Sequence, residues 1–171
     1  PGISSRHGTI TVAGQTLEIK QAGRVRHALS IHKTGTGSGT VSSTPSGINC
    51  GSTCSARFDY DTVVTLTASA STGSTFTGWS GNGCSGTGDC VVTMDAARSV
   101  TATFTLNQYA LTVNKAGNGA GTVTSTDGTI NCGTSCTATH DNGTAVTLTA
   151  SPASGSTFTR WSGGGCSGTG T

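Results

Sequence analysis

The segment His27-Ala-Leu-Ser-Ile-His-Lys33 recurs 82 positions later as Tyr109-Ala-Leu-Thr-Val-Asn-Lys115. The offset holds without a gap to the end of the chain, and 38 of the 63 aligned positions are identical. Equivalent pairs under this offset are Cys50 and Cys132, Cys54 and Cys136, Trp79 and Trp161, and Cys84 and Cys166. The chain therefore contains a tandem duplication, and each copy is expected to form one structural unit.

Short alternating segments fill each repeat. The best of them is Thr62-Val-Val-Thr-Leu-Thr-Ala68, which is rich in β-branched residues and half apolar. Glycine punctuates the chain throughout, and no long amphipathic segment is present, so helix is nearly excluded. The predicted strands of repeat 1 are residues 28–31, 40–44, 62–68, 75–79, 91–94 and 100–104. The sequence predicts an all-β fold whose few apolar residues form the core.

The composition excludes several classes of protein. Gly, Ser and Thr supply 83 of 171 residues, charged residues only 9%, and the net charge is +2. A nucleic-acid binder needs a clustered basic surface, which a near-neutral chain lacks. A membrane-spanning helix needs about 18 consecutive apolar residues, and no such run is present. Low charge also argues against disorder, which combines low hydrophobicity with high net charge.

Three segments are predicted along the chain. Residues 1–25 lie outside the repeat and contain a hairpin around Ala13-Gly14-Gln15, which must dock on another surface because an isolated hairpin is marginally stable. Residues 26–107 form repeat 1, and residues 108–171 form repeat 2. Only Leu106, Asn107 and Gln108 connect the last strand of repeat 1 to repeat 2, so the repeats are expected to stack end to end.

The repeat resembles the divergent internalin-B-type B repeat of bacterial surface and secreted proteins. The motifs that carry the resemblance are Gly39-Thr-Val41, Gly47-Ile-Asn-Cys-Gly51, Val64-Thr-Leu-Thr-Ala68, Phe76-Thr-Gly-Trp79, Val92-Thr-Met94 and Val100-Thr-Ala-Thr-Phe104. The resemblance covers almost all of residues 27–171. It implies a β-grasp-like module or a small sandwich that serves as a spacer or an adhesive surface.

The opening segment, residues 6–21, resembles the last hairpin of a BACON-type domain, a module associated with carbohydrate or mucin contact. Only that tail is present. The chain begins at Pro1 without an initiator Met, and we interpret it as a fragment or a processed product of a larger secreted protein.

Seven cysteines in so polar a chain favour an oxidising compartment. The sequence predicts local disulfides, because glycine-rich loops can close short rings. The alternative is a zinc site made of four thiols per repeat, but no histidine or acid accompanies the cysteines in both copies. The predicted disulfide cysteines are Cys50 with Cys54, Cys84 with Cys90, and Cys132 with Cys136. Cys166 is left unpaired, since its partner would fall at position 172.

Other candidate sites have structural interpretations that we favour. Trp79 and Trp161 could stack on sugar rings, but a chain with 5% aromatic residues needs them in its core. The stretch at 78–82 is close to a nucleophile elbow without its last glycine. A catalytic Ser-His-Asp triad would need a histidine that recurs in both repeats, which is not true of His7, His27, His32 or His140. Three aspartates could bind calcium but are better explained as turn residues: Asp59, Asp61 and Asp141. The glycosylation sequon Asn142-Gly-Thr144 is also set aside. The sequence predicts no catalytic residue, no cofactor and no metal.

The favoured function is a non-enzymatic structural or adhesive segment of a secreted or surface-anchored bacterial protein: a stalk, an adhesin shaft or a filament subunit. The alternative is a carbohydrate-binding accessory region of a secreted hydrolase, with glycans as partners. The location is extracellular or on the bacterial cell surface.

Repeat 2 lacks counterparts of residues 91–94 and 100–104, so its sheet should expose an unpaired edge. Cloning or proteolysis could have cut the chain there. Alternatively, identical subunits or neighbouring repeats complete each other by strand addition, head to tail, which would build a filament.

Overall fold

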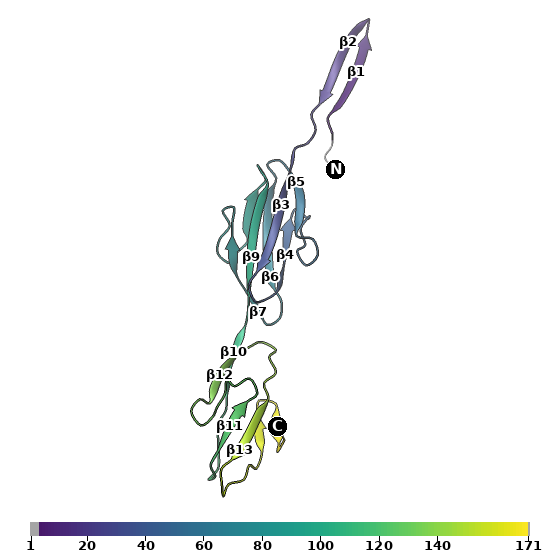
Figure 1. Ribbon diagram of the computed structural model, residues 1–171. Helices are drawn as coiled ribbons and strands as arrows, with labels where there is room; N and C mark the ends of the chain where they lie inside the picture. The colour runs from purple at the N-terminus through teal and green to yellow at the C-terminus, as the bar shows by residue number, and fades with distance from the viewer. Residues whose placement is uncertain (1–3, 171) are drawn as a thin grey trace. The chain divides into compact units, whose positions relative to one another are not determined.

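The computed structural model describes residues 4–170, and every regular element in this range is a β-strand, as the sequence predicts. The chain divides into two compact units, one ending at Leu106 and the other starting at Asn107 (Figure 1). Each unit is therefore described by itself. The expected end-to-end stacking of the repeats stays a prediction.

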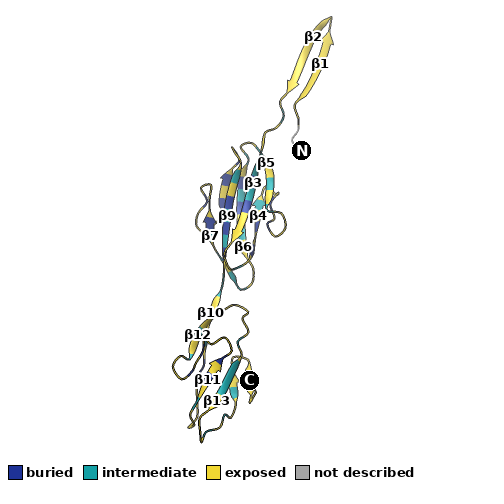
Figure 2. Ribbon diagram, in the orientation of Figure 1, coloured by how far each residue is buried: buried dark blue, intermediate teal, exposed yellow. Residues whose placement is uncertain are grey.

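The first two strands, β1 (Arg6–Val12) and β2 (Gln15–Gln21), form the predicted antiparallel hairpin. Ala13 and Gly14 make the turn with φ values of +49° and +79°, the left-handed conformation that a two-residue type I′ turn requires at both positions. Every residue of both strands is exposed (Figure 2). The docking surface expected for this hairpin stays a prediction.

Repeat 1 folds into two sheets. The first has the order β5-β3-β9-β7, and the second has the order β4-β6-β8. Neighbouring strands are antiparallel except β3 and β9, which run parallel with Ile31 opposite Val100. The strands are β3 (Arg26–Thr34), β4 (Gly39–Thr44), β5 (Ser55–Asp59), β6 (Val63–Ala70), β7 (Ser74–Ser80), β8 (Cys90–Thr93) and β9 (Arg98–Leu106).

The two sheets share a single apolar core. Leu29 and Phe104 come from the first sheet and Val41 and Leu66 from the second, and each is at most 1% exposed. In β9, alternate residues point into this cluster, and Thr and Ser occupy the outward positions (Figure 2). Of the two architectures expected, this is the small sandwich, because the described residues include no helix to complete a β-grasp.

The six predicted strands of repeat 1 are confirmed, and one strand was missed. Residues 55–59 form β5, which pairs with β3 and buries Phe58 in the core. Ala56 and Phe58 do alternate with polar neighbours, but the signal is short and contains Arg57. Burial of so short a strand depends on its partner β3 rather than on its own pattern.

Close packing fixes the glycine loop between β3 and β4. A Cβ added to Gly35, Gly37 or Gly39 would lie 1.9 Å from the Phe104 carbonyl oxygen, 2.6 Å from the Thr105 carbonyl carbon and 2.2 Å from the Phe104 ring, respectively. The Gly37 N–H also donates to the Phe104 carbonyl, 3.0 Å away. These glycines therefore let the loop lie directly on β9.

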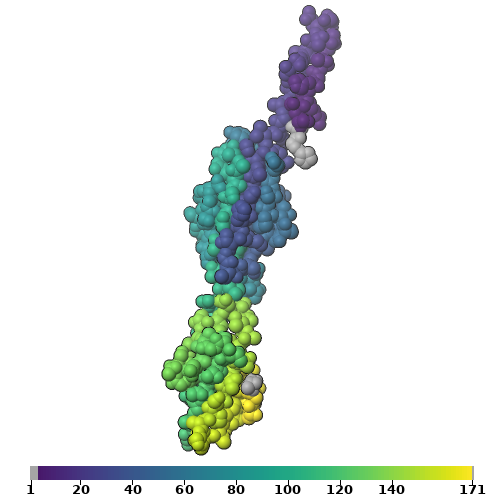
Figure 3. Space-filling model, in the orientation of Figure 1, coloured from purple at the N-terminus to yellow at the C-terminus, as the bar shows by residue number. Residues whose placement is uncertain are grey.

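Repeat 2 has shorter strands and smaller sheets. The pairs are β10 with β12, β11 with β13, and β14 with β15, all antiparallel. A core of Val113, Val123, Ile130 and Cys132 lies between them. The strands are β10 (Gln108–Thr112), β11 (Gly121–Ser125), β12 (Thr137–Asp141), β13 (Leu148–Pro152), β14 (Trp161–Gly163) and β15 (Cys166–Gly168). In the space-filling view they form one body, coloured green to yellow (Figure 3).

The variant Gly37→Ala is expected to destabilise repeat 1 by about 2–3 kcal/mol, because the new methyl group overlaps the backbone of β9. Denaturant unfolding, followed by Trp79 fluorescence in a Trp161→Phe background, measures the change. The matched control is Gly51→Ala, whose Cβ would meet only the Thr40 methyl at an ordinary 3.6 Å. Equal stabilities of the two variants would contradict this account of the loop.

Candidate functional site

The disulfide between Cys50 and Cys54 lies where the two sheets of repeat 1 meet. The Cys50 N–H donates to the Val41 carbonyl of β4 at 2.7 Å, and the Ile31 N–H of β3 donates to the Cys54 carbonyl at 2.7 Å. Cys50 is fully buried in the core. This five-residue ring therefore links one strand of each sheet, rather than only fixing a loop tip.

Repeat 2 reproduces this arrangement. Cys132 is joined to Cys136, the Cys132 N–H donates to Val123 at 2.6 Å, and the Val113 N–H donates to Cys136 at 2.8 Å. The same local sequence thus builds the same link twice, as expected from the repeat.

A second disulfide, between Cys84 and Cys90, closes the loop that holds Trp79. The Trp79 indole Nε1 donates to the Gly88 carbonyl at 2.7 Å, and its backbone N–H donates to the Gly86 carbonyl at 2.9 Å. The Trp79 ring packs edge-on against Phe76, with ring centroids 4.9 Å apart, and is 5% exposed. A ring buried in this way offers no open face to a sugar.

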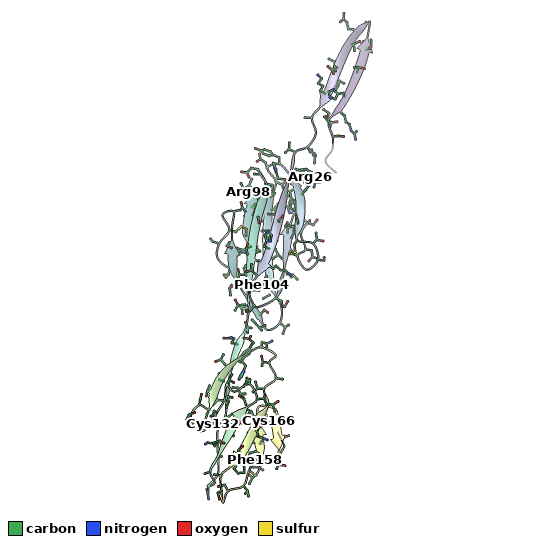
Figure 4. All side chains as sticks on the ribbon, viewed as in Figure 1. Arg26, Arg98, Phe104, Cys132, Phe158 and Cys166 are labelled. Atoms are coloured by element: carbon green, nitrogen blue, oxygen red, sulfur yellow. A yellow bond between two sulfur atoms is a disulfide. The ribbon has the colours of Figure 1, made fainter. Side chains whose placement is uncertain are left out.

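Trp161 occupies the equivalent place in repeat 2 but is half-buried. Its Nε1 donates to the Gly170 carbonyl at 2.6 Å, and its ring lies 4.8 Å from that of Phe158. Cys166, on β15, is free and exposed (Figure 4). Within residues 4–170, no three His, Cys, Asp or Glu side chains come close enough to share a metal ion.

The structure brings Ser125, Asp127 and His140 together in repeat 2, a grouping that the sequence analysis did not predict. Ser125 Oγ donates to Asp127 Oδ1 and accepts a hydrogen bond from the Ile130 N–H at 2.9 Å. His140 Nδ1 lies 3.4 Å from Asp127 Oδ2. The His140 side chain is 10% exposed, and its Nε2 is buried without a hydrogen-bond partner in the described structure.

Comparison of the two repeats could have revealed this cluster. The offset of 82 places Asp127 at the position of Pro45 and His140 at the position of Phe58. Two ionisable residues therefore replace two apolar ones at sites that the fold places close together. A paired exchange of this kind within a duplication signals contact between the two positions.

Hydrogen bonds set the charge state of Asp127. The Ser125 hydroxyl, then the Thr129 N–H and hydroxyl at 3.1 and 2.9 Å, stabilise the carboxylate, and His140 adds a smaller electrostatic contribution. Together they lower the pKa of Asp127 from its ordinary 3.8 to about 2, against a small opposing effect of burial. These contacts are those of an Asx-type turn between β11 and the segment that follows it.

This cluster is not arranged as a nucleophile with its base. Ser125 donates its hydroxyl proton to Asp127, whereas a nucleophilic serine would donate to a histidine nitrogen. The other residues considered above have structural contacts of their own. Asp59 forms ion pairs with Arg24 and Arg26, Asp61 sits in a turn with φ +60°, His7 lies 3.6 Å from Glu18, and His27 lies beside Tyr60.

Non-reducing mass spectrometry is expected to show Cys50 linked to Cys54, Cys84 to Cys90 and Cys132 to Cys136, with Cys166 open to alkylation. Intact mass before and after iodoacetamide treatment counts the free thiols. Stoichiometric zinc in the purified protein, with every thiol protected by the metal, would contradict the disulfide assignment.

Repeat 2 is expected to lose stability as the pH falls from about 4 towards 2. A carboxyl whose pKa is depressed in the folded state stabilises that state above its unfolded pKa, and the stabilisation disappears as the folded group is protonated. Thermal unfolding at pH 6, 4, 3 and 2 measures the effect. Asp127→Asn should flatten this dependence, whereas the control Asp61→Asn should leave it unchanged.

Comparison with known proteins gives one family. No curated protein and no solved structure matches the chain. The family model of the divergent InlB B-repeat domain matches residues 29–108 and again residues 109–171. The matched segments begin after the hairpin, so its BACON-like character stays a prediction.

The matched segments coincide with the duplication found in the sequence and with the two similar folds. Within residues 4–170, no helix is long and apolar enough to span a membrane. Repeats of this family indicate a surface or extracellular repeat region of a bacterial protein. With most of its length covered by the two matches, the chain belongs to the divergent InlB B-repeat family, as two tandem members.

Proposed function

We propose that this segment is a non-enzymatic structural element of a bacterial surface or secreted protein, a disulfide-stabilised shaft whose partners are neighbouring repeats or identical subunits. The observation that carries the proposal is that Trp79 and the cysteines of repeat 1 have structural roles. In repeat 1, Trp79, Cys50, Cys84 and Cys90 are buried in the core, Cys54 is partly buried against it, and the cysteines are paired in disulfides.

The outward faces support the same role. In β9 the residues that alternate with the core are Ser99, Thr101, Thr103 and Thr105, and in β6 they are Val63, Thr65, Thr67 and Ser69. Such faces are polar but nearly uncharged, so they stay soluble without attracting a charged partner. A low density of ionisable groups and cysteines joined in disulfides suit a segment that works as a spacer outside the cell.

The disulfides should make the segment resistant to proteases. A cross-link restricts the unfolded chain, and a protease cleaves the opened form. Native protein is expected to survive digestion by thermolysin much longer than protein reduced and alkylated beforehand. Half-lives read from gel bands over time give the ratio.

Removal of the Trp79 ring separates this proposal from the alternative, a carbohydrate-binding accessory region. Trp79→Ala is expected to destabilise repeat 1 by about 3–5 kcal/mol, because it empties a core position, and to change no glycan binding. Denaturant unfolding and a glycan array measure the two effects. The matched variant Trp161→Ala alters the half-buried counterpart.

The alternative would replace the proposal if the protein bound a glycan and Trp161→Ala abolished that binding while both repeats stayed folded. Folding is checked by the amide resonances of the core residues Val123 and Ile130 in repeat 2. No glycan retained by the native protein, together with the loss of stability of Trp79→Ala, supports the structural role.

A further inference from the structure

The chain enters and leaves repeat 1 through two strands that lie side by side. The first strand, β3, begins at Arg26, and the last strand, β9, ends at Leu106. The two strands are parallel and pair over six residue pairs, beginning with Leu29 opposite Arg98 (Figure 1). The points of entry and exit are therefore at opposite ends of one parallel ladder.

Tension along the chain loads this ladder in shear. A pull on the residues before Arg26 draws β3 towards its own start, and a pull on the residues after Leu106 draws β9 towards its own end. Because the strands are parallel, these two directions are opposite, and the strands must slide past each other. The hydrogen bonds of a parallel ladder are evenly spaced along it. They therefore share the load, whereas a ladder that is pulled apart from one end loses its bonds one after another.

Neither of the two loaded strands lies at an edge. In the sheet order β5-β3-β9-β7, β3 and β9 are the two inner strands. β5 pairs with the first residues of β3, from Arg26 to Ser30, and β7 pairs with residues 101–106 of β9. Each loaded strand is therefore held on both sides, and neither can be stripped from the sheet as an edge strand can.

Side chains in the core resist the same sliding. The inward residues of the ladder are buried, and they belong to the apolar cluster between the two sheets: Leu29 and Ile31 of β3, and Val100 and Phe104 of β9. A shift of one strand by one residue would turn its buried side chains to the outer face, because successive side chains point to opposite faces. Sliding therefore costs core packing as well as backbone hydrogen bonds.

Hydrogen bonds outside the ladder hold the end of β9 in place. The Gly37 N–H donates to the Phe104 carbonyl at 3.0 Å, and the Leu106 N–H donates to Thr36 Oγ1 at 3.1 Å. Both bonds join the last residues of β9 to the loop directly after β3. Sliding of the two strands must break them together with the ladder.

We propose that repeat 1 is a force-bearing module in which the β3–β9 ladder acts as a mechanical clamp. Tension that passes along the chain is resisted at this ladder, and the repeat unfolds only when β3 and β9 slide apart. The proposal deepens the structural role proposed above and rests on it for the origin of the tension, since a shaft that connects a cell surface to an attached object carries such a load. It assigns to repeat 1 a resistance to pulling that a spacer without load does not need.

Single-molecule force spectroscopy tests the clamp by pulling the whole chain in two directions, in a Cys166→Ser background. One handle is at the N-terminus, and the other is attached to a new thiol at an exposed position. Gln108→Cys loads the β3–β9 ladder in shear, whereas Ala96→Cys pulls β9 from the end that lies beside the start of β3 and so unzips the ladder. At the same pulling speed, the unfolding force is expected to be severalfold higher in the shear direction, because the bonds of the ladder then break together.

The length of chain released identifies the event as the unfolding of repeat 1. In the shear direction, 80 backbone steps lie between Arg26 and Leu106, and the two disulfide rings keep 10 of them closed. At about 3.5 Å per step, the unfolded repeat reaches about 245 Å. The increase in extension equals this length less the end-to-end distance of the folded repeat. The hairpin of β1 and β2 lies between the same handles, but its residues are all exposed, so it should open at a much lower force.

Two matched variants show which contacts set the force. Val100→Ala and Val64→Ala delete the same atoms from positions that are both 0% exposed, so both should lower the stability measured by denaturant unfolding. Val100 lies in the ladder opposite Ile31, whereas Val64 lies in β6 of the other sheet, opposite Val92. Forced unfolding depends on the rate of crossing the unfolding barrier rather than on equilibrium stability. Only Val100→Ala should therefore lower the force in the shear direction.

Two results would overturn the proposal. One is an equal unfolding force in the two directions of pulling. The other is an equal loss of force in Val100→Ala and Val64→Ala, since the force would then follow the overall stability of the repeat rather than the ladder. Neither result contradicts the shaft role itself. That role fails instead if the protein binds a glycan and Trp161→Ala abolishes the binding, an outcome that leaves the measured forces unchanged.

Discussion

The parallel pairing of β3 with β9 is the constraint on which the rest of repeat 1 depends. It joins segments about 70 residues apart and places β9 at the centre of the larger sheet, where Val100, Ala102 and Phe104 are sealed from water. Burial of apolar surface is the main stabilising contribution in so polar a chain, at about 25 cal/mol per Å². β5 and β7 pair with the two outer edges of this strand pair, and the sheet of β4, β6 and β8 shares its apolar core.

Repeat 2 shows the consequence of that dependence. Its sequence is similar to that of repeat 1 throughout the aligned region, but strand structure is absent at many of the positions whose partners in repeat 1 are β8 and β9, such as residues 113–116 and 145–147. What persists is the part that short-range contacts can hold, including the link at Cys132 and Cys136. The two copies thus compare similar sequences whose described strand pairings differ.

The disulfides and the glycines have complementary effects in this small domain. A module of about 80 residues buries too little surface to be very stable, so cross-links that restrict the unfolded chain matter more here than in a larger protein. Because Cys50 is also part of the core, the cross-link adds packing at the junction of the sheets. Glycines such as Gly37 let the chain approach β9 closely enough to exclude water.

The sequence by itself determined the local features: the duplication, the alternating strands, the hairpin around Ala13-Gly14-Gln15 and the short disulfide rings. Each depends on residues close together in the chain, so a pattern of a few positions is enough to predict it. The tertiary structure decided which strands pair, that β5 forms, that Trp79 is more deeply buried than Trp161, and that Asp127 meets His140. These features depend on contacts between segments that are distant in the sequence. The alternation of apolar and polar residues predicts which face of a strand is buried, but it does not predict which strand lies beside it.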